Sequence, residues 1–442
     1  MVYIDRIQGQ ELSAFIHAES PSSNVLLIEG ARQVGKTTLA METLNHYQGS
    51  IIRINLEREK RLLSRIDDCI EFSDFATVLQ DEVKFNSDIS SVLFIDEAQE
   101  SAVLGGFVRF MKEEWPKTRI ILTGSTLTRL FRPNQRFPVG RFSRLLVTPF
   151  SFSEFLKCVA QENLCENLKK PGAISLVRHT TLLKELDRYL TLGGLPAVVA
   201  AYSNKEDWRR LRQELLAGYE DDFRRILKED SMALVKAAFR AVSGLAGSAF
   251  KNSAVRVSLN SAQNEQVNSI LERLEEWKIF LRSNQKGLSP ESAIAYHPKR
   301  YFFDSGILRE LRESAIPSIA LLDGSDSSVR TVLGALIENQ TAIELSRRND
   351  SLTGFKKSSS GLEIDFIVKK GEMTFPVECK ATLQIRGTHL KGVLAYLDMF
   401  NLKTGVVISL APYGEIACSG NRKVINVPLY AAEHLYDFLL KN

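Results

Sequence analysis

Short apolar runs recur through the first 150 residues of the chain, and stretches with helical periodicity separate them. The runs are Val25–Ile28, Ile51–Asn55, Val92–Ile95, Arg119–Leu122 and Arg144–Val147. Strands that alternate with helices predict a parallel sheet with helices on both faces. Ligands of such sheets bind at the carboxyl ends of the strands, where polar residues follow these runs. Residues 1–150 are therefore predicted to form one α/β domain.

The middle of the chain is mainly helical in pattern. Residues 151–230 have helical periodicity interrupted at Gly193-Gly194, which predicts a helical linker. Within residues 231–300, Gln266–Trp277 spaces its apolar residues by three and four, and Lys278–Ser283 then alternates like a strand. This order predicts a winged-helix-like unit, which is either a DNA-reading module or a small packing or oligomerisation domain. Glutamates on the exposed side of the helix argue against contact with a phosphate backbone.

A hairpin pattern dominates the last part, residues 301–442. Gly361–Val368 and Met373–Lys380 have strand character, a turn lies between them, and a helical stretch follows. Residues two apart on a strand project from the same face. Glu378 and Lys380 should therefore point together, with Asp365 brought beside them by the hairpin.

Composition limits the number of domains and the class of protein but does not indicate a function. A chain of 442 residues with 44% apolar and 25% charged residues is expected to form two or three packed domains. A net charge of +4 neither demands nor excludes nucleic acid. The five cysteines are scattered without C-x-x-C, which favours a reducing cytoplasm over a zinc site or disulfide framework. No signal peptide is apparent and the apolar runs are too short to cross a bilayer, so no membrane association is expected.

The most informative motif is G-x-x-x-x-G-K-T between an apolar strand and a helix-forming run, the context of a phosphate-binding P-loop. Its glycines let backbone N–H groups point inward as an anion nest, and the helix adds its positive end. Lys36 would reach the β- and γ-phosphates and Thr37 would hold Mg²⁺. The candidate ATP-binding residues are Gly30, Ala31, Arg32, Gln33, Val34, Gly35, Lys36, Thr37 and Thr38.

Acidic and hydroxyl residues follow the third and fourth runs. Asp96 would complete the Mg²⁺ site, and Glu97 would polarise the attacking water. Ser125 or Thr123 would sense the γ-phosphate, although either could instead cap the next helix. In the basic segment beyond, Arg141 is the candidate arginine finger of a neighbouring subunit, which would require a homo-oligomer; the alternative is a solvated basic loop.

The late hairpin carries a second candidate chemistry. Two carboxylates with a lysine suit phosphodiester cleavage that depends on Mg²⁺ or Mn²⁺. Asp365 and Glu378 would hold the metal, and Lys380 would orient water and offset charge at the scissile phosphate. The alternatives are a chance charged hairpin, or the fold without the activity.

The ordered motifs resemble the prokaryotic AAA+ ATPases with a C-terminal DUF4143 region. They are G-A-R-Q-V-G-K-T-T, F-I-D-E-A-Q, I-L-T-G-S and P-F-S-F-S-E-F. Tyr189–Pro196 resembles the Y-L-x-x-G-G-x-P linker of that group, and the resemblance implies that the helical residues 151–230 form a lid. Arg300–Gly306 resembles its K-x-Y-F-x-D-x-G signature, with Arg300 taken in the Lys place.

The hairpin resembles the D-x(n)-E-x-K core of restriction-endonuclease-like nucleases, especially archaeal Holliday-junction resolvases. That resemblance implies a further Glu on the preceding helix, and Glu338 fits the place. The fold class expected from both resemblances is α/β: a P-loop AAA+ sheet, a helical or winged-helix middle, and a restriction-endonuclease-like domain at the C-terminus.

The leading functional hypothesis is an ATPase coupled to a metal-dependent DNA nuclease that acts on branched DNA, in repair or in defence. In that hypothesis Glu338, Asp365, Glu378 and Lys380 cut the DNA. The alternative is an ATP-switched DNA- or protein-binding regulatory module whose nuclease-like fold does not cleave. A third hypothesis is a signalling ATPase with a protein partner.

Overall fold

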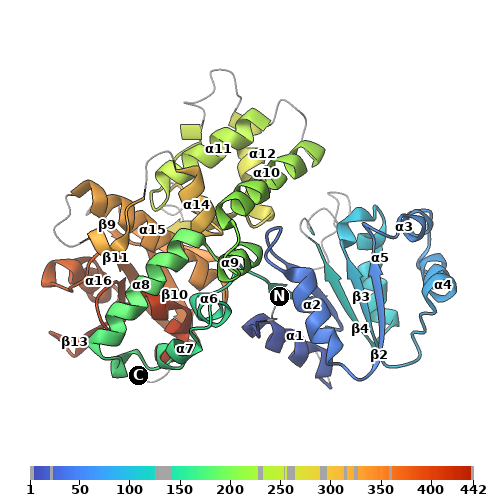
Figure 1. The fold of residues 1–442 in the computed structure, drawn as a ribbon, viewed down its shortest axis with the longest axis horizontal. Helices are drawn as coiled ribbons and strands as arrows, with labels where there is room; N and C mark the ends of the chain where they lie inside the picture. The colour runs from blue at the N-terminus through green and yellow to red at the C-terminus, as the bar shows by residue number, and fades with distance from the viewer. Residues whose placement is uncertain are drawn as a thin grey trace. The chain divides into compact units, whose positions relative to one another are not determined.

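The protein is described from a computed structural model that covers residues 4–19, 23–124, 127, 142–226, 232–252, 254–255, 264–288, 296–312, 316–322, 327–349, 351–357 and 361–439. The chain divides into two compact units, Met1–Thr148 and Pro149–Asn442 (Figure 1). Among the helices in the described ranges, none combines the length and the apolar character needed to cross a bilayer.

The first unit contains a five-stranded sheet in which every neighbouring pair is parallel, in the order β2-β3-β4-β1-β5. Each strand lies within one residue of its predicted bounds, which confirms the α/β class. The strands are β1 (Val25–Glu29), β2 (Ser50–Asn55), β3 (Ser91–Asp96), β4 (Thr118–Thr123) and β5 (Ser143–Leu146).

Helices cover both faces of this sheet (Figure 1). On one face lie α1 (Ile7–His17) and α2 (Lys36–Asn45); on the other lie α3 (Lys60–Asp67), α4 (Phe72–Val83) and α5 (Leu104–Glu114). An aromatic cluster of Phe75, Phe107 and Trp115 packs α4 and α5 together at ring-centroid distances of 5.1 and 5.9 Å. Because both faces are covered, β3 is buried along its whole length, as parallel strands generally are.

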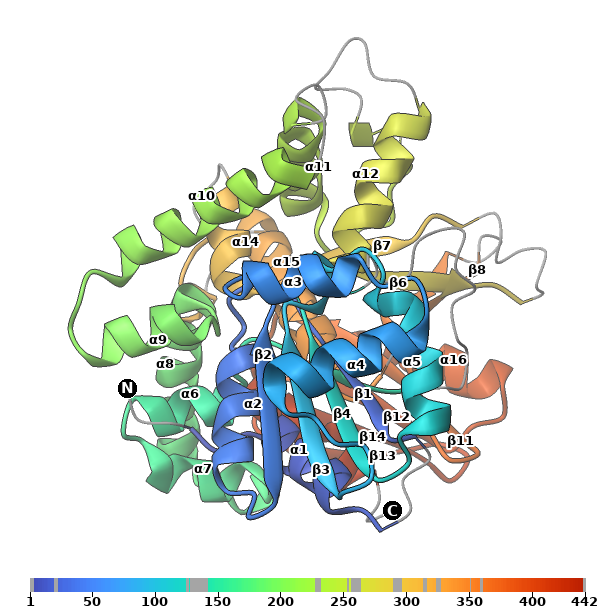
Figure 2. The same ribbon diagram turned by 90° about the vertical axis from the view of Figure 1, so that its right-hand side faces the viewer.

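The second unit begins with a series of helices, consistent with the helical pattern of the middle of the chain (Figure 2). The predicted helix over Gln266–Trp277 is α12, and its apolar face, including Val267 and Leu271, is buried. The helices are α6 (Phe152–Cys158), α7 (Glu162–Leu168), α8 (Leu176–Leu192), α9 (Pro196–Ser203), α10 (Trp208–Ile226), α11 (Met232–Leu245), α12 (Asn264–Glu276) and α14 (Ser305–Leu311).

The strand predicted after α12 is present, and it joins a larger sheet. β6 (Phe280–Lys286) pairs with β7 (Lys299–Phe302) on one edge and with β8 (Leu352–Lys357) on the other; β9 (Leu362–Ile364) completes the order β7-β6-β8-β9. The strand predicted in the winged-helix-like unit therefore shares its hydrogen bonding with strands of the C-terminal part. This satisfies an edge that an isolated pair would leave open.

A second sheet in this unit has the order β10-β11-β12-β14-β13. The predicted hairpin is its start, since β10 and β11 are antiparallel, and the predicted helix is the crossover α16 between the parallel strands β11 and β12. The elements are β10 (Phe366–Lys370), β11 (Met373–Lys380), α16 (Gly387–Met399), β12 (Thr404–Ser409), β13 (Gly414–Cys418) and β14 (Arg422–Pro428). The long helix α15 (Ser327–Ser346) packs against β11 and β7.

The strand predicted over Gly361–Val368 is divided at Asp365. β9 pairs with β8 in one sheet, whereas β10 pairs with β11 in the other. Asp365 is the residue at which the chain passes between the two sheets, and this change of partner interrupts the strand.

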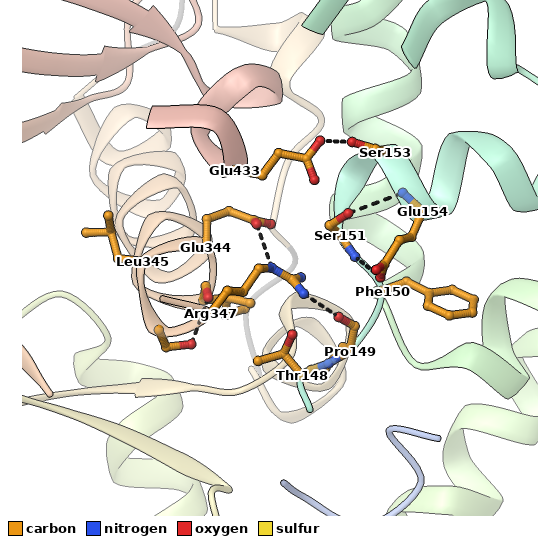
Figure 3. Close-up of polar contacts among 12 residues, drawn as sticks. Thr148, Pro149, Phe150, Ser151, Ser153, Glu154, Glu344, Leu345, Arg347 and Glu433 are labelled. Atoms are coloured by element: carbon orange, nitrogen blue, oxygen red, sulfur yellow. Dashed lines mark hydrogen bonds and ion pairs between the residues drawn. The ribbon is translucent and has the colours of Figure 1, made fainter. Parts of the chain in front are cut away.

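Buried polar contacts hold the start of the second unit to parts distant in sequence (Figure 3). The guanidinium of Arg347, on the turn after α15, donates to the carbonyl of Pro149 at 2.9 Å and pairs with Glu344 at 2.7 Å. The Tyr189 hydroxyl donates to the carbonyl of Phe150 at 2.7 Å. The segment after residue 148 is therefore fixed by side chains from both the helical part and the C-terminal part of the unit.

Gly193 ends α8 under a close steric constraint. Its φ of +81° lies in the left-handed region, and a Cβ added there would be 2.2 Å from Oδ1 of Asp304. The Asp304 carboxylate is already hydrogen-bonded: it accepts from the backbone N–H of Gly194 at 2.7 Å and from that of Ile307 at 2.9 Å. A side chain at position 193 would therefore disturb both the α8 terminus and the start of α14.

We predict that Gly193→Ala destabilises the second unit by about 2–4 kcal/mol, from backbone strain and the clash with Asp304. Urea unfolding followed by tryptophan fluorescence measures the change. Gly334→Ala is the control, since Gly334 lies inside α15 with nothing within 4 Å of an added Cβ, and alanine there favours the helix by roughly 1 kcal/mol. Equal stability of Gly193→Ala and the wild type would contradict the prediction.

Candidate functional site

The loop after β1, residues 30–35, has the curled backbone expected of a P-loop. Gly30, Gln33 and Gly35 have φ values of +150°, +64° and +88°, which curl the chain before α2 begins at Lys36. A Cβ on Gly30 would lie 2.2 Å from the carbonyl oxygen of Val147, so only glycine fits there. A loop of this shape ahead of a helix N-terminus is an anion-binding arrangement.

Lys36 is buried at the head of α2. Its ammonium donates to the carbonyls of Gly30 at 3.0 Å and Ala31 at 2.8 Å, across the mouth of the loop. Burial lowers the pKa of Lys36 to about 8, although Glu97 and Asp96 act in the opposite direction. The loop therefore combines backbone donors with a cation, the two features needed to bind phosphate.

Asp96 is the centre of a hydrogen-bond cluster at the carboxyl ends of three strands. The Thr37 hydroxyl lies 3.1 Å from both carboxylate oxygens, and the Asn55 amide donates to Oδ2 at 3.0 Å. The Thr123 hydroxyl also donates to Oδ1. Asp96 is only 3% exposed, and each of these side-chain partners is uncharged.

The residues of this cluster fit a divalent cation. The Thr37 hydroxyl and the Asp96 carboxylate supply hard oxygen ligands of the kind that Mg²⁺ prefers. Their mutual hydrogen bond shows that β3 and α2 already hold them together. Bound there, Mg²⁺ would offset the charge of the nucleotide phosphates.

Glu97 lies beside this cluster in an unusual backbone conformation. Its φ is +52°, and its carboxylate accepts a hydrogen bond of 2.5 Å from the side-chain amide of Gln99. Burial raises the pKa of Glu97, with the Gln99 bond and Lys36 acting in the opposite direction. An oriented, half-buried carboxylate of this kind can act as a base toward water.

Several residues around the loop were not identified from the sequence. Asn55 and Gln99 contact the two acids, and the buried guanidinium of Arg6 donates to the carbonyls of Val34 at 3.0 Å and Thr148 at 2.6 Å. Asn55 could have been found, because it ends an apolar run as Asp96 does; Arg6 carries no such signal. Of the two sensor candidates, Thr123 contacts Asp96, whereas Ser125 and the finger candidate Arg141 lie outside the described residues.

The hairpin of the second unit brings its predicted acids together. The backbone N–H of Cys379 donates to Oδ2 of Asp365 at 2.9 Å, which aligns Asp365 with the strand that carries Glu378 and Lys380. The Lys380 ammonium pairs with Oε1 of Glu378 at 2.5 Å. Burial, then the neighbouring Asp365, raises the pKa of Glu378 to about 7.

A lysine that was not predicted as a site residue occupies the centre of this group. The ammonium of Lys299 lies 2.9 Å from Oε1 of Glu338, 3.0 Å from Oδ1 of Asp365 and 2.8 Å from Oε1 of Glu363. The Tyr301 hydroxyl donates to the same oxygen of Glu338 at 2.6 Å. Glu338 and Asp365 therefore meet as the resemblance implied, but through an ammonium group.

Assigning Arg300 to the Lys place of K-x-Y-F-x-D-x-G is wrong by one residue. Counted back from Tyr301 and Asp304, that place falls on Lys299. Neighbouring residues on a strand point to opposite faces, and the Arg300 guanidinium accordingly pairs with Glu275 of α12 at 2.7 Å, away from the acids.

Asp365 and Glu338 do not fit a shared divalent metal as they stand. Magnesium binds oxygen at about 2.0–2.1 Å, so an ion shared by Asp365 and Glu338 would occupy the space of the Lys299 ammonium. The other oxygen of Asp365 is engaged by the Cys379 N–H. Within the described part of the chain, no group of three or more His, Cys, Asp or Glu side chains is arranged to hold a metal ion.

Comparison with known proteins gives three matching regions. Residues 22–156 match the family described as an AAA domain, and residues 183–316 match a domain of unknown function, DUF8612. Residues 333–430 match a second domain of unknown function, DUF4143. An uncharacterized protein of Haemophilus influenzae is 23% identical over 363 residues, which cover 79% of this chain and 80% of that protein.

Two solved structures are similar to the chain at low identity. The Walker-type ATPase paby2304 of Pyrococcus abyssi has a TM-score of 0.46 and 16% identity, with 70% of this chain and 96% of that chain covered. The ORC2 protein of Aeropyrum pernix has a TM-score of 0.36 and 15% identity, with 70% and 94% covered. The matches confirm the resemblance stated from the motifs: the chain carries an AAA-type P-loop domain followed by a C-terminal DUF4143 domain.

Proposed function

We propose that this P-loop ATPase works as an ATP-dependent switch: its first unit hydrolyses ATP with Mg²⁺, and its second unit binds DNA without cutting it. The observation that supports the hydrolytic part best is the pairing of Thr37 with Asp96 beside the buried Lys36. The cytoplasm is the proposed location, since the five described cysteines are free thiols.

The proposed roles follow the contacts in the first unit. The backbone of residues 30–38 and the Lys36 ammonium bind the phosphates, and Thr37 with Asp96 holds Mg²⁺. Glu97, oriented by Gln99, positions and polarises the attacking water. Thr123 and Asn55 hold the Asp96 carboxylate at the strand ends.

The proposal for the second unit is the non-cleaving alternative. DNA is the proposed partner because the unit retains the hairpin arrangement that resembles nucleases. A homo-oligomer is also proposed, with Arg141 as the residue that would reach a neighbouring nucleotide.

We predict that Lys36→Ala weakens ATP binding by about 10- to 100-fold, the loss expected for hydrogen bonds to a charged group. Glu97→Gln is expected to bind ATP normally but to hydrolyse it roughly 10²–10⁴-fold more slowly, because a general base is lost. Fluorescent-nucleotide titration and phosphate release measure the two effects separately.

Glu100→Gln is the matched control for Glu97→Gln. Glu100 lies three residues further on, is partly exposed, and pairs with Lys60 at 3.5 Å, so its substitution should leave hydrolysis unchanged. A Glu97→Gln protein that hydrolyses ATP at the wild-type rate would remove Glu97 from the proposed mechanism.

A second candidate function is metal-dependent DNA cleavage by the second unit. The observation that favours it is Oε2 of Glu378, which is buried and has no hydrogen-bond partner within the described chain. Asp365, Glu378 and Lys380 also lie together on the hairpin as cleavage would require. The position of Lys299 argues against this candidate.

We predict that DNA changes the ATPase rate while remaining uncut. The measurement compares ATP hydrolysis with and without duplex, single-stranded and four-way-junction DNA, in wild type and Lys36→Ala, and follows the DNA on gels with Mg²⁺ or Mn²⁺. Cleavage that disappears in Asp365→Ala would establish the second candidate. An ATPase rate insensitive to every DNA, together with no salt-sensitive DNA binding, would instead favour a protein partner.

A further inference from the structure

The Lys299 side chain has an unusually complete set of anionic partners. It is 2% exposed, and its ammonium has three hydrogen-bond donors. Three carboxylates, from Glu338, Asp365 and Glu363, lie within 3.0 Å of it. The number of acceptors thus matches the number of donors that a lysine offers.

Burial alone would favour the neutral amine, because a charge loses its hydration inside a protein. Asp365, Glu338 and Glu363 outweigh that effect and raise the pKa of Lys299 well above its ordinary value. The lysine is therefore held as a cation, and the carboxylates gain a permanent counter-charge.

Neighbouring contacts fix the strand from which Lys299 projects. The side chain of Asn339 on α15 accepts from the N–H of Phe302 at 2.8 Å and donates to its carbonyl at 3.1 Å. The Tyr301 hydroxyl bonds to Glu338, also on α15. These contacts attach β7 to α15, the helix that carries Glu338. The position of the Lys299 ammonium is therefore set by backbone hydrogen bonds of β7 as well as by charge.

We propose that Lys299 is the built-in cation of this centre: its ammonium stands where a divalent metal would otherwise bridge Asp365 and Glu338, so the second unit takes no metal there. The inference rests on the non-cleaving part of the proposed function and gives it a physical cause. It is independent of ATP hydrolysis in the first unit.

A consequence of this arrangement is that removal of the ammonium creates a cation site. In Lys299→Met the methionine fills a similar volume without charge, and the carboxylates of Glu338, Asp365 and Glu363 face one another uncompensated. Like charges at such distances are relieved by taking up a proton or by binding a metal cation. Lys299→Met therefore removes the internal cation, and the carboxylates then need an external cation in its place.

The test measures Mn²⁺ binding by electron paramagnetic resonance on the full chain, without nucleotide and in an Asp96→Asn background that removes the carboxylate of the first site. We expect Lys299→Met to bind Mn²⁺ at least about tenfold more tightly than the background protein. Its melting temperature should fall, and Mn²⁺ should raise it again. Adding Asp365→Asn should abolish both responses to Mn²⁺.

Lys356→Met is the matched control, because Lys356 pairs with Glu363 at 3.5 Å from an exposed position and should gain no Mn²⁺ site. If Lys299→Met fails to fold, Lys299→Met/Glu338→Gln removes one carboxylate together with the ammonium and preserves the comparison. The proposal would also be overturned if the background protein, with Lys299 intact, bound Mn²⁺ and lost that binding on Asp365→Asn. So would a folded Lys299→Met that gains no affinity for Mn²⁺.

Discussion

A buried charge must be paired, and the two acidic centres of this protein satisfy that constraint in opposite ways. Asp96 receives hydrogen bonds from Thr37, Asn55 and Thr123, which are neutral, and its charge also interacts with the nearby Lys36 ammonium. Asp365 is paired directly with the ammonium of Lys299, which it shares with Glu338 and Glu363. In our proposal the same carboxylate chemistry therefore holds a metal in the first unit and an internal cation in place of a metal in the second.

Because Asp365 is paired with Lys299, the second unit can have the fold that its motif indicates without the metal chemistry that the motif suggests. The hairpin, the crossover helix and the glutamate on α15 are all in place, and Asp365, Glu378 and Lys380 are neighbours. One additional cation, brought in by β7, changes what these side chains can do. A motif that contains every expected residue can thus belong to a centre whose electrostatics favour a structural role.

Buried guanidinium groups bind the last residue of the first unit and the first residue of the second, each within its own unit. Within the first unit, Arg6 binds the carbonyl of Thr148 and that of Val34 in the phosphate loop. Within the second unit, Arg347 binds the carbonyl of Pro149. Successive carbonyls on the two sides of the boundary are therefore fixed by buried guanidinium groups, and one of these groups also contacts the nucleotide-binding loop.

Local sequence determined the strands of the first sheet, α12, the hairpin and the P-loop, because periodicity and glycine placement act over a few residues. It also predicted that Asp365 and Glu378 would be neighbours. Only the tertiary structure decided that Lys299 stands among the acids while Arg300 points away, and that Asn55 and Arg6 support the nucleotide site. Those contacts join residues tens to more than a hundred positions apart, and whether a buried carboxylate meets a neutral donor or a cation depends on which strands become neighbours in space.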